Sequence, residues 1–166
     1  TGKTPMVEYL IRLLKTDYKL AALSRGYGRK SKGFQLGNES ASAEILGDEP
    51  FQFYNKFKSF ISVAVDGDRQ NGIAHLLNLK PTPEVIILDD AFQHRKVKAG
   101  FNILLTTYSN LYFKDWVLPS GNLREPRQGA RRANLIVVTK CPDAITENEK
   151  KAIKNRIQLR DNQQVF

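Results

Sequence analysis

The chain begins with residues that suit phosphate binding. Thr1, Gly2, Lys3 and Thr4 match the end of the phosphate-loop pattern G-x-x-x-x-G-K-[ST], whose first glycine would precede residue 1. In the complete pattern, backbone N–H groups and a helix N-terminus hold the phosphates, the lysine contacts the β and γ oxygens, and the hydroxyl binds magnesium. Because the same residue types also form ordinary surface turns, the motif indicates a nucleotide site only if a helix follows directly.

Two carboxylates close the apolar run PEVIILDD. Asp89 and Asp90 have the form of a Walker B element, in which a carboxylate at a strand tip completes the magnesium shell. A strand that simply ends in an acidic turn is the alternative. Adjacent carboxylates repel one another unless a cation lies near, so a metal is the better explanation if the phosphate loop is real.

A second acidic pair, Asp48 and Glu49, lies in the letters GDEP. A phosphoryl-transfer enzyme could use one of them as general base on an acceptor hydroxyl and the other as a metal ligand. Acidic residues and proline also favour the first turn of a helix, and the residues alone favour that structural explanation.

Several basic and polar side chains beside glycines or strand ends are candidates for holding an anionic acceptor. Taken singly, each is more often a solvated charge than a ligand, and a lone histidine is more often a hydrogen-bonded structural residue. These candidates are Arg25, Tyr27, Arg29, Arg69, His94, Arg95 and Arg124.

The elements that must position these residues alternate between apolar runs and helical patterns. Apolar spacing from Pro5 predicts an amphipathic helix over residues 5–15. We predict strands at 19–24, 60–66, 83–90, 101–107 and 135–140, and further helices within 47–58 and at 69–79 and 146–159, the last with an N-cap threonine.

Continuous apolar strands alternating with helices predict an α/β fold, with a mainly parallel sheet covered by helices on both faces. Such sheets bind ligands at the C-terminal ends of their strands. The polar motifs follow candidate strands or open candidate helices, so we expect them to gather at one edge of the sheet.

The composition bounds the class of protein. With 166 residues and 41% hydrophobic content, the chain is long enough for one sizeable core, and we expect a single domain over residues 1–166. It has no run of about 18 apolar residues that could span a bilayer. Its one cysteine, Cys141, fits a reducing compartment.

The net charge of +9 favours anionic partners without choosing among them. Phosphates, acidic lipid headgroups and nucleic acid would all be attracted. A basic nucleic-acid-binding module is therefore an alternative to an enzyme, although its paired carboxylates would then face the same phosphates. A stretch of aromatic and basic residues at 51–58 could rest on a membrane surface, but a helix with one face in the core is the better explanation.

Taken together, the motifs resemble the lipid A 4'-kinase (tetraacyldisaccharide 4'-kinase) family of Gram-negative bacteria. The order and approximate spacing match over nearly the whole chain for TGKTP, LSRGYGRKSKG, GDEP, VIILDDAFQHR and LPSGNLREPRQGARRANLIVVTK. LIVVTK is followed by Cys141-Pro142-Asp143, so the N-K-x-D guanine motif of GTPases is not met. The resemblance implies a P-loop kinase fold with ATP and Mg²⁺ as cofactors.

The resemblance also implies roles for particular residues. Lys3 and Thr4 would bind the nucleotide and magnesium, and Asp48 would be the catalytic base. Glu49, with Asp89 or Asp90, would complete the metal ligands. The acceptor side would be lined by Arg25, Tyr27, Arg69, Gln93, His94 and Arg124.

The reaction implied is transfer of the γ-phosphoryl group of ATP to the 4'-hydroxyl of tetraacyldisaccharide 1-phosphate, giving lipid IVA, on the cytoplasmic face of the inner membrane. Partners would be the anionic glycolipid and the membrane surface, with no nucleic acid and no obligate protein partner. A different P-loop kinase or ATPase acting on a soluble anion is the alternative within enzymes.

The ends of the chain also differ from the family pattern. Members of the family carry an N-terminal membrane-associated segment and a second, C-terminal domain, which we expect outside residues 1–166. We therefore expect the chain to be truncated at both ends and to be weakly active or inactive by itself.

Overall fold

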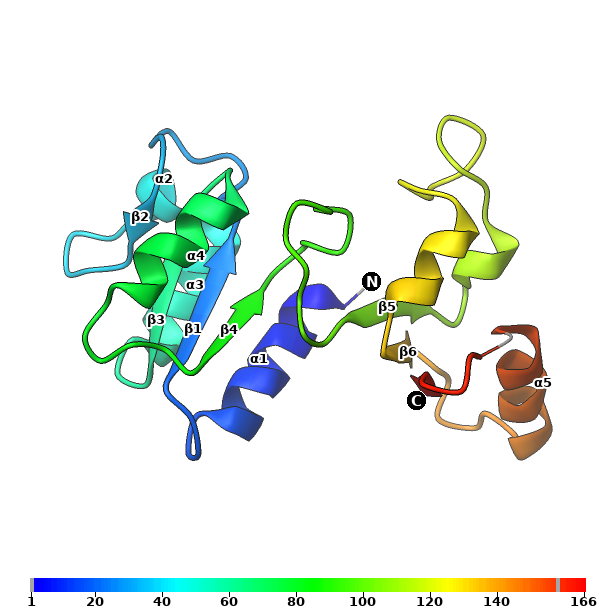
Figure 1. The fold of residues 1–166 in the computed structure, drawn as a ribbon. Helices are drawn as coiled ribbons and strands as arrows, with labels where there is room; N and C mark the ends of the chain where they lie inside the picture. Colours follow the sequence, from blue (N-terminus) through cyan, green and yellow to red (C-terminus); the bar gives the residue numbers. More distant parts are fainter. Residues whose placement is uncertain (1, 158) are drawn as a thin grey trace. The chain divides into compact units, whose positions relative to one another are not determined.

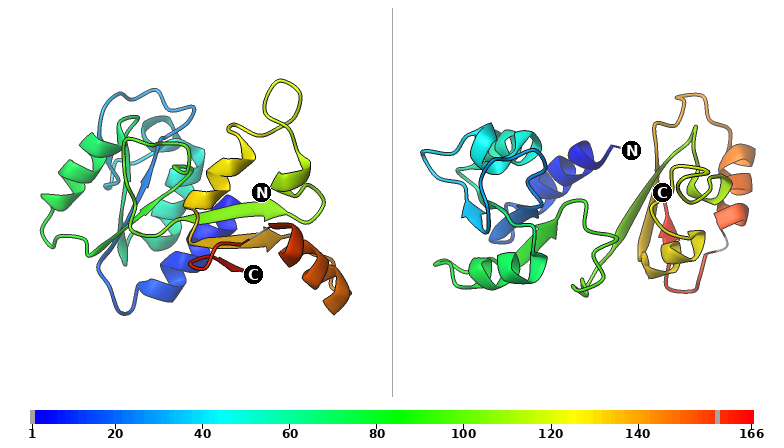
Figure 2. Two further views of the ribbon diagram at one scale, coloured as in Figure 1. Left: turned by 45° about the vertical axis from the view of Figure 1, so that its right-hand side comes forward. Right: turned by 90° about the horizontal axis from the view of Figure 1, so that it is seen from above.

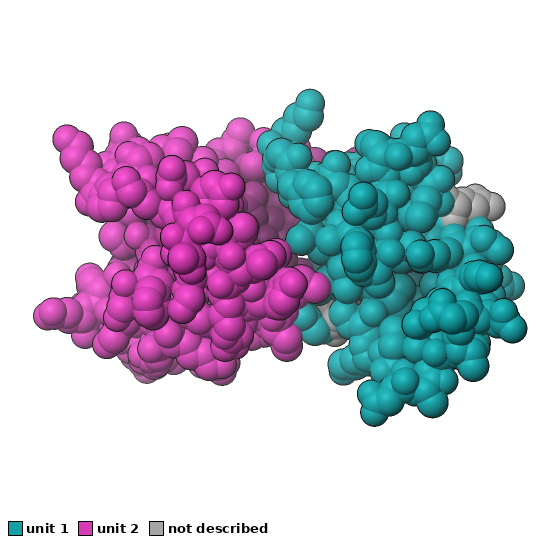
Figure 3. All heavy atoms as spheres, turned by 90° about the horizontal axis from the view of Figure 1, so that it is seen from below, with its two compact units in different colours: residues 1–2, 98–166 teal, residues 3–97 magenta. Residues whose placement is uncertain are grey.

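The computed structural model describes residues 2–157 and 159–166. They divide into two compact units, which are coloured separately in Figure 3. One unit is Lys3–Val97, and the other contains Gly2 and the described residues from Lys98 to Phe166. The assignment of residues 1–166 to one nucleotide-binding domain stays a prediction.

The sheet of the Lys3–Val97 unit has four strands in the order β2-β3-β1-β4 (Figure 1). β1 (Leu20–Ser24) is central and runs parallel to β3 (Ile61–Val65) and β4 (Val85–Leu88), while the short β2 (Gln35–Leu36) pairs antiparallel with β3. All residues of β1 are buried, as expected of a parallel strand covered on both faces. The three predicted strands are confirmed, within two residues at each end.

Helices cover both faces of this sheet (Figure 2). On one face, side chains of α1 (Lys3–Leu14) and α3 (Asp48–Phe57) pack against Leu20 and Ala22 of β1. On the other face, Leu76 of α4 (Arg69–Leu77) packs with Ala21 and Leu23. Successive residues of β1 thus face opposite sides, as the strand period requires. The predicted α/β class with a mainly parallel sheet is confirmed.

The parallel register brings the C-terminal ends of three strands to one edge. The Asp66 N–H, just beyond β3, donates to the Ser24 carbonyl at 3.0 Å, and the Asp89 N–H, just beyond β4, donates to the Leu23 carbonyl at 3.0 Å. Ser24, Asp66 and Asp89 therefore lie at neighbouring strand tips, where sheets of this class bind ligands.

The second unit has a parallel sheet of β5 (Ile103–Thr107), β6 (Leu135–Thr139) and β7 (Gln164–Val165). Its helix α5 (Glu147–Ile157) begins with a reciprocal cap. The Thr146 hydroxyl accepts the Glu149 N–H at 3.3 Å, and the Glu149 carboxylate accepts the Thr146 N–H at 2.8 Å. This confirms the predicted N-cap threonine.

Short elements were not predicted from the sequence. They are β2, β7, α2 (Ala43–Leu46) and the 3₁₀ helices η1 (Tyr112–Lys114) and η2 (Arg127–Arg132). With two to six residues each, they are too short to display a strand or helix period. Within the described residues, no helix has the length and apolar character needed to cross a bilayer.

Candidate active site

The phosphate-loop residues lie at the start of a helix. α1 begins at Lys3, directly after Gly2, whose φ of +81° is readily adopted only by glycine. Pro5 lies in the first turn, where its missing N–H costs no hydrogen bond. The helix N-terminus that the motif requires is therefore present, while Thr1 lies outside the described residues.

Lys3 reaches the tip of β4. Its Nζ forms an ion pair with Asp90 Oδ1 at 2.7 Å, and the two side chains are 41% and 39% exposed. Asp90 has a φ of +48°, a left-handed conformation that aspartate tolerates better than most residues, and it lies in the turn that follows β4. Because an exposed ion pair is worth only about 0–1 kcal/mol, the ammonium group can exchange Asp90 for a phosphate at little cost.

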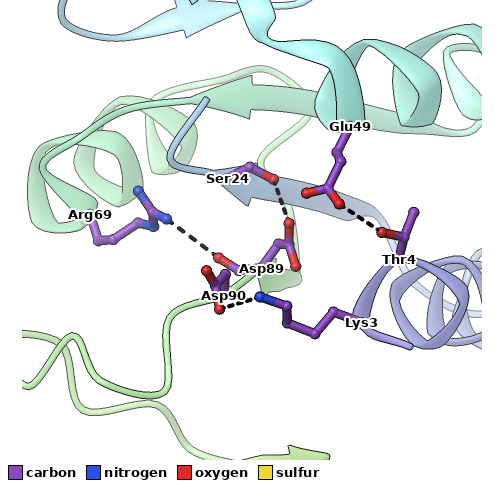
Figure 4. A network of polar contacts seen from close by, with 7 residues as sticks. All are labelled: Lys3, Thr4, Ser24, Glu49, Arg69, Asp89 and Asp90. Carbon is purple, nitrogen blue, oxygen red and sulfur yellow. Dashed lines mark hydrogen bonds and ion pairs between the residues drawn. The ribbon is translucent and has the colours of Figure 1, made fainter. Parts of the chain in front are cut away.

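Thr4 connects α1 to the second acidic pair. Its hydroxyl donates to Glu49 Oε1 at 3.0 Å, and Glu49 lies in the first turn of α3. The threonine predicted to bind magnesium and one of the predicted metal carboxylates are thus in direct contact (Figure 4).

Asp89 is the buried carboxylate of the cluster, with 7% of its surface exposed. Burial raises its pKa above the usual aspartate value, and the nearby charges of Glu49 and Asp90 raise it further, against the opposing effect of Lys3. Its carboxylate accepts a hydrogen bond from the Ser24 hydroxyl at 3.4 Å. Asp89 is thus repelled by two other carboxylates, and a divalent cation bound there would relieve that repulsion.

The side chains of this cluster are of the types that bind Mg²⁺. Within residues 2–157 and 159–166, no three His, Cys, Asp or Glu side chains are arranged to hold a metal ion by themselves. Mg²⁺ is usually bound through one or two carboxylates together with substrate phosphates and water, so a complete protein cage is not needed. Glu49, Asp89 and Asp90, with the Thr4 hydroxyl, supply oxygen donors of the required kind.

Asp48 is exposed at the start of α3, and a glycine places it beside a second loop. Gly47 has a φ of +88°, and a Cβ there would lie 2.9 Å from the Tyr27 carbonyl oxygen. Only glycine fits this close approach. Asp48 is therefore next in the chain to a glycine that contacts the loop carrying Arg25 and Tyr27. The side chains of Arg25 and Tyr27 are exposed, that of Tyr27 to 93%.

Arg69 is buried, with 3% of its surface exposed. Its guanidinium donates to the Asp66 backbone carbonyl and, at 3.3 Å, to the Asp89 carbonyl. Burial lowers the Arg69 pKa, and the charge of nearby Arg25 lowers it further. In the structure this side chain joins the tips of β3 and β4, and its predicted contact with an acceptor stays a prediction.

The remaining acceptor candidates have different positions. Gln93 is exposed in the turn after β4, and the adjacent His94 N–H donates to the Ala91 carbonyl at 2.8 Å. His94 Nε2 is buried and has no hydrogen-bond partner within the described residues. Arg124 belongs to the other compact unit and is exposed there. The structure thus brings together the phosphate-loop residues and both acidic pairs, but it does not show Arg124 with them.

Two residues at the strand tips were not among the sequence candidates. Ser24 donates to Asp89, and the buried Asp66 accepts hydrogen bonds from the Asp68 N–H at 2.9 Å and Asn71 Nδ2 at 2.7 Å. Both end predicted strands, in KLAALS and FISVAVD. The rule that sheets of this class bind ligands at strand ends therefore points to both residues from the sequence alone.

A Gly-Lys-Thr helix N-terminus facing carboxylates at the tips of a parallel sheet defines a P-loop kinase fold. In agreement, residues 1–165 match the family model described as LpxK, tetraacyldisaccharide-1-P 4'-kinase. The chain belongs to this family.

Individual relatives agree with the family assignment. The chain is 60% identical over 166 residues to the tetraacyldisaccharide 4'-kinase of Flavobacterium johnsoniae, covering 100% of this chain and 48% of the relative. It is 53% identical over 168 residues to the tetraacyldisaccharide 4'-kinase of Phocaeicola vulgatus, and this match covers 100% of this chain and 46% of the relative. The chain thus spans about half the length of the curated relatives it matches.

A solved structure shows the same fold. The crystal structure described as the "apo" form of LpxK from Aquifex aeolicus in complex with ATP matches with a TM-score of 0.73 and 42% sequence identity. The match covers 88% of this chain and 47% of that chain.

Proposed function

We propose that the chain is the nucleotide- and metal-binding part of a kinase that phosphorylates the 4'-hydroxyl of tetraacyldisaccharide 1-phosphate, with ATP as donor and lipid IVA as product. The observation that carries the proposal is the convergence of Lys3 and Thr4 with Glu49, Asp89 and Asp90 at one edge of a parallel sheet. The names of the family and of the relatives supply the acceptor.

In this proposal the N-terminus of α1 holds the phosphates of ATP. Lys3, which pairs with Asp90 in this structure, would contact the phosphate oxygens, and the Thr4 hydroxyl, which bonds Glu49, would serve as a metal ligand. Asp89 and Asp90 with Glu49 supply the carboxylates. When bound, Mg²⁺ neutralises charge that develops on the transferred phosphoryl group. The ATP complex of the Aquifex aeolicus relative supports the choice of nucleotide.

Asp48 is proposed as the general base. It is exposed, so an acceptor hydroxyl can reach it, and it is the chain neighbour of the metal ligand Glu49. Its carboxylate would accept the proton of the 4'-hydroxyl as that oxygen attacks the γ-phosphorus. The kinase then needs little more than correct placement and charge neutralisation, which is typical of phosphoryl transfer.

The acceptor would lie on the side of the Arg25–Tyr27 loop. We propose Arg25, Tyr27, Gln93 and His94 as acceptor contacts, together with Arg69 and Arg124. The acceptor is an anionic lipid, so the proposed location is the cytoplasmic face of the bacterial inner membrane, and the net charge of +9 favours that surface.

The test is Asp48→Asn in the purified full-length protein, because we expect this chain to be weakly active or inactive by itself. We expect the rate of γ-phosphoryl transfer to tetraacyldisaccharide 1-phosphate to fall by about 10²- to 10⁴-fold, the usual contribution of a general base. ATP affinity, measured by calorimetry, should be unchanged. The matched control is Asp17→Asn, which alters an exposed aspartate beyond the other end of α1. Full activity of Asp48→Asn would disprove the assignment of the base.

A further inference from the structure

A loop in the second unit presents three consecutive large apolar side chains to solvent. Trp116, Val117 and Leu118 are 67%, 38% and 59% exposed. They lie in the segment between η1 and η2, which loops out in yellow-green in Figure 1. We call residues 115–123 the Trp116 loop. Leaving such a cluster in water has a free-energy cost, which suggests that it is covered by a partner in the cell.

The base of the Trp116 loop is organised by one carboxylate. Asp115 Oδ1 accepts the N–H groups of Trp116 at 2.8 Å and Asn122 at 3.1 Å, and Oδ2 accepts Asn110 Nδ2 at 3.2 Å. These hydrogen bonds lower the Asp115 pKa, and the bond from the Asn122 N–H has the largest effect. The only acidic side chain of residues 115–123 therefore accepts hydrogen bonds from the loop backbone and from the Asn110 side chain.

Backbone hydrogen bonds close the loop above this base. The Leu123 N–H donates to the Trp116 carbonyl at 2.9 Å, and the Leu118 N–H donates to the Leu123 carbonyl at 3.0 Å. A Cβ on Gly121 would clash with the Trp116 carbonyl and the Asp115 carboxylate, so glycine is required there. Because the loop is tied down, its apolar side chains can be buried by a partner with little further loss of conformational entropy.

Positive charge surrounds the apolar tip. Residues 112–132 contain five basic and two acidic residues, and one of the two acids, Glu125, pairs with Arg132 at 2.8 Å. Lys114, Arg127 and Arg131 are exposed. The Arg127 guanidinium lies over the Trp116 ring at 5.1 Å from its centroid.

An anionic bilayer matches this combination better than other partners do. Tryptophan is enriched at the headgroup level of membranes, leucine gains from contact with acyl chains, and lysine and arginine are attracted to anionic headgroups. A nucleic acid would use the cations and Trp116, but it would gain nothing from Val117 and Leu118. A purely apolar protein groove would leave the surrounding cations without a role.

We propose that the Trp116 loop is an interfacial anchor that places Trp116 and Leu118 among the headgroups of an anionic bilayer. The inference deepens the proposed function, on which it rests for the location of the lipid acceptor. It names the element of this chain that holds the protein at the membrane surface.

Trp116 is the single tryptophan of the chain, so tryptophan fluorescence reports on this loop alone. We would titrate the purified protein with vesicles of phosphatidylglycerol and phosphatidylcholine. The expected result is a blue shift of the Trp116 emission and quenching by lipids brominated on their acyl chains. Vesicles of phosphatidylcholine alone should give a much smaller effect, and salt should weaken the response to the anionic vesicles.

Variants measured by vesicle sedimentation separate the two contributions. Leu118→Ser should lower partitioning about tenfold through the lost apolar contact, and Lys114→Gln about fivefold through the lost charge. The matched control is Phe101→Ser, because Phe101 is 62% exposed in the same unit but lies outside the loop. That variant should partition as the wild type does.

Failure of the anchor and failure of the proposed kinase are distinguishable. Phosphorylation of acceptor dispersed in detergent should persist in Leu118→Ser, because no bilayer has to be reached. Full-length wild-type protein that never phosphorylates the acceptor, although this chain binds vesicles through Trp116, would contradict the kinase and support the anchor. Absence of vesicle binding, or binding that leaves Trp116 emission unchanged, would overturn the anchor.

Discussion

At the scale of single residues, the site depends on how each carboxylate is held. Asp89 and Asp90 were predicted from their place at the end of an apolar run, and the structure shows why the two differ. Asp89 is buried and contacts Ser24, whereas Asp90 turns outward and pairs with Lys3. The sequence could not show this difference, because it depends on the turn at Asp90 and on the neighbouring strand β1.

Ser24 provides a prediction at this scale. Its hydroxyl donates to the carboxylate that we propose as a metal ligand, and such supporting contacts typically change metal affinity by 10- to 100-fold. Ser24→Ala should therefore raise the Mg²⁺ concentration required for half-maximal kinase activity by about tenfold. Activity at saturating Mg²⁺ should recover. Ser59→Ala, an exposed serine after α3, serves as control. An unchanged Mg²⁺ requirement would remove Ser24 from the site.

At the scale of elements, long patterned segments were predictable and short ones were not. The apolar spacing that begins at Met6 predicted α1, and the buried run LAALS predicted β1. By contrast, β2 contains two residues, and its place beside β3 depends on pairing with Ala64 and Val65. Arg69 stays a proposed acceptor contact. Its burial could not be predicted from a local pattern, because it follows from the packing of α4 against the sheet.

Arg69 gives a prediction about the strand tips. Arg69→Met removes a charged donor that bonds the carbonyls of Asp66 and Asp89, and hydrogen bonds to charged groups are each worth about 1.5–3 kcal/mol. We expect a loss of about 2–3 kcal/mol in the free energy of unfolding, measured with denaturant. The control Arg156→Met, at an exposed position of α5, should change little. Unchanged stability with a raised KM for the acceptor would instead favour an acceptor contact.

The link between α1 and α3 predicts a dependence on pH. Glu8 of α1 accepts a hydrogen bond from Lys56 of α3 at 2.5 Å, which is the largest cause of its lowered pKa, and Arg12 bonds it at 3.1 Å. A lowered pKa in the folded state stabilises the protein above the usual glutamate pKa, and this stabilisation is lost as pH falls through the lowered value.

Glu8→Gln should therefore reduce the free energy of unfolding at neutral pH and flatten its decline in acid. Urea titrations at a series of pH values measure both effects. Glu39→Gln, at an exposed position, is the control and should follow the wild-type curve. If Glu8→Gln retained the wild-type pH dependence, the link between the two helices would contribute nothing to the pH dependence of the free energy of unfolding.

At the scale of the whole molecule, charge and length were available from the sequence, but the division into units was not. No change in composition marks the boundary between Val97 and Lys98, which separates the two compact units. The site residues from Lys3 to His94 lie within Lys3–Val97, whereas Gly2, Arg124 and the Trp116 loop belong to the other unit. The net charge of +9 was equally compatible with nucleic acid, and it is the acidic cluster that favours a nucleotide with its metal.

The charge predicts a specific outcome with DNA. Attraction between a basic protein and duplex DNA arises from counterion release, so it weakens steeply as salt increases. We expect only non-specific binding that is largely lost between about 50 and 200 mM salt. Fluorescence anisotropy with labelled duplexes of different sequence measures this. Tight, sequence-dependent binding that persists at 200 mM salt would favour a nucleic-acid-binding module.

The most direct test of the central claim is calorimetric titration of ATP with and without Mg²⁺, in wild-type protein and Lys3→Met. If the cluster at the strand tips is a magnesium nucleotide site, ATP binding should be strengthened by Mg²⁺. Lys3→Met should weaken it by roughly 30-fold, as expected for a lost charge-assisted hydrogen bond of about 2 kcal/mol. Equal ATP affinity in both proteins, independent of Mg²⁺, would contradict the claim.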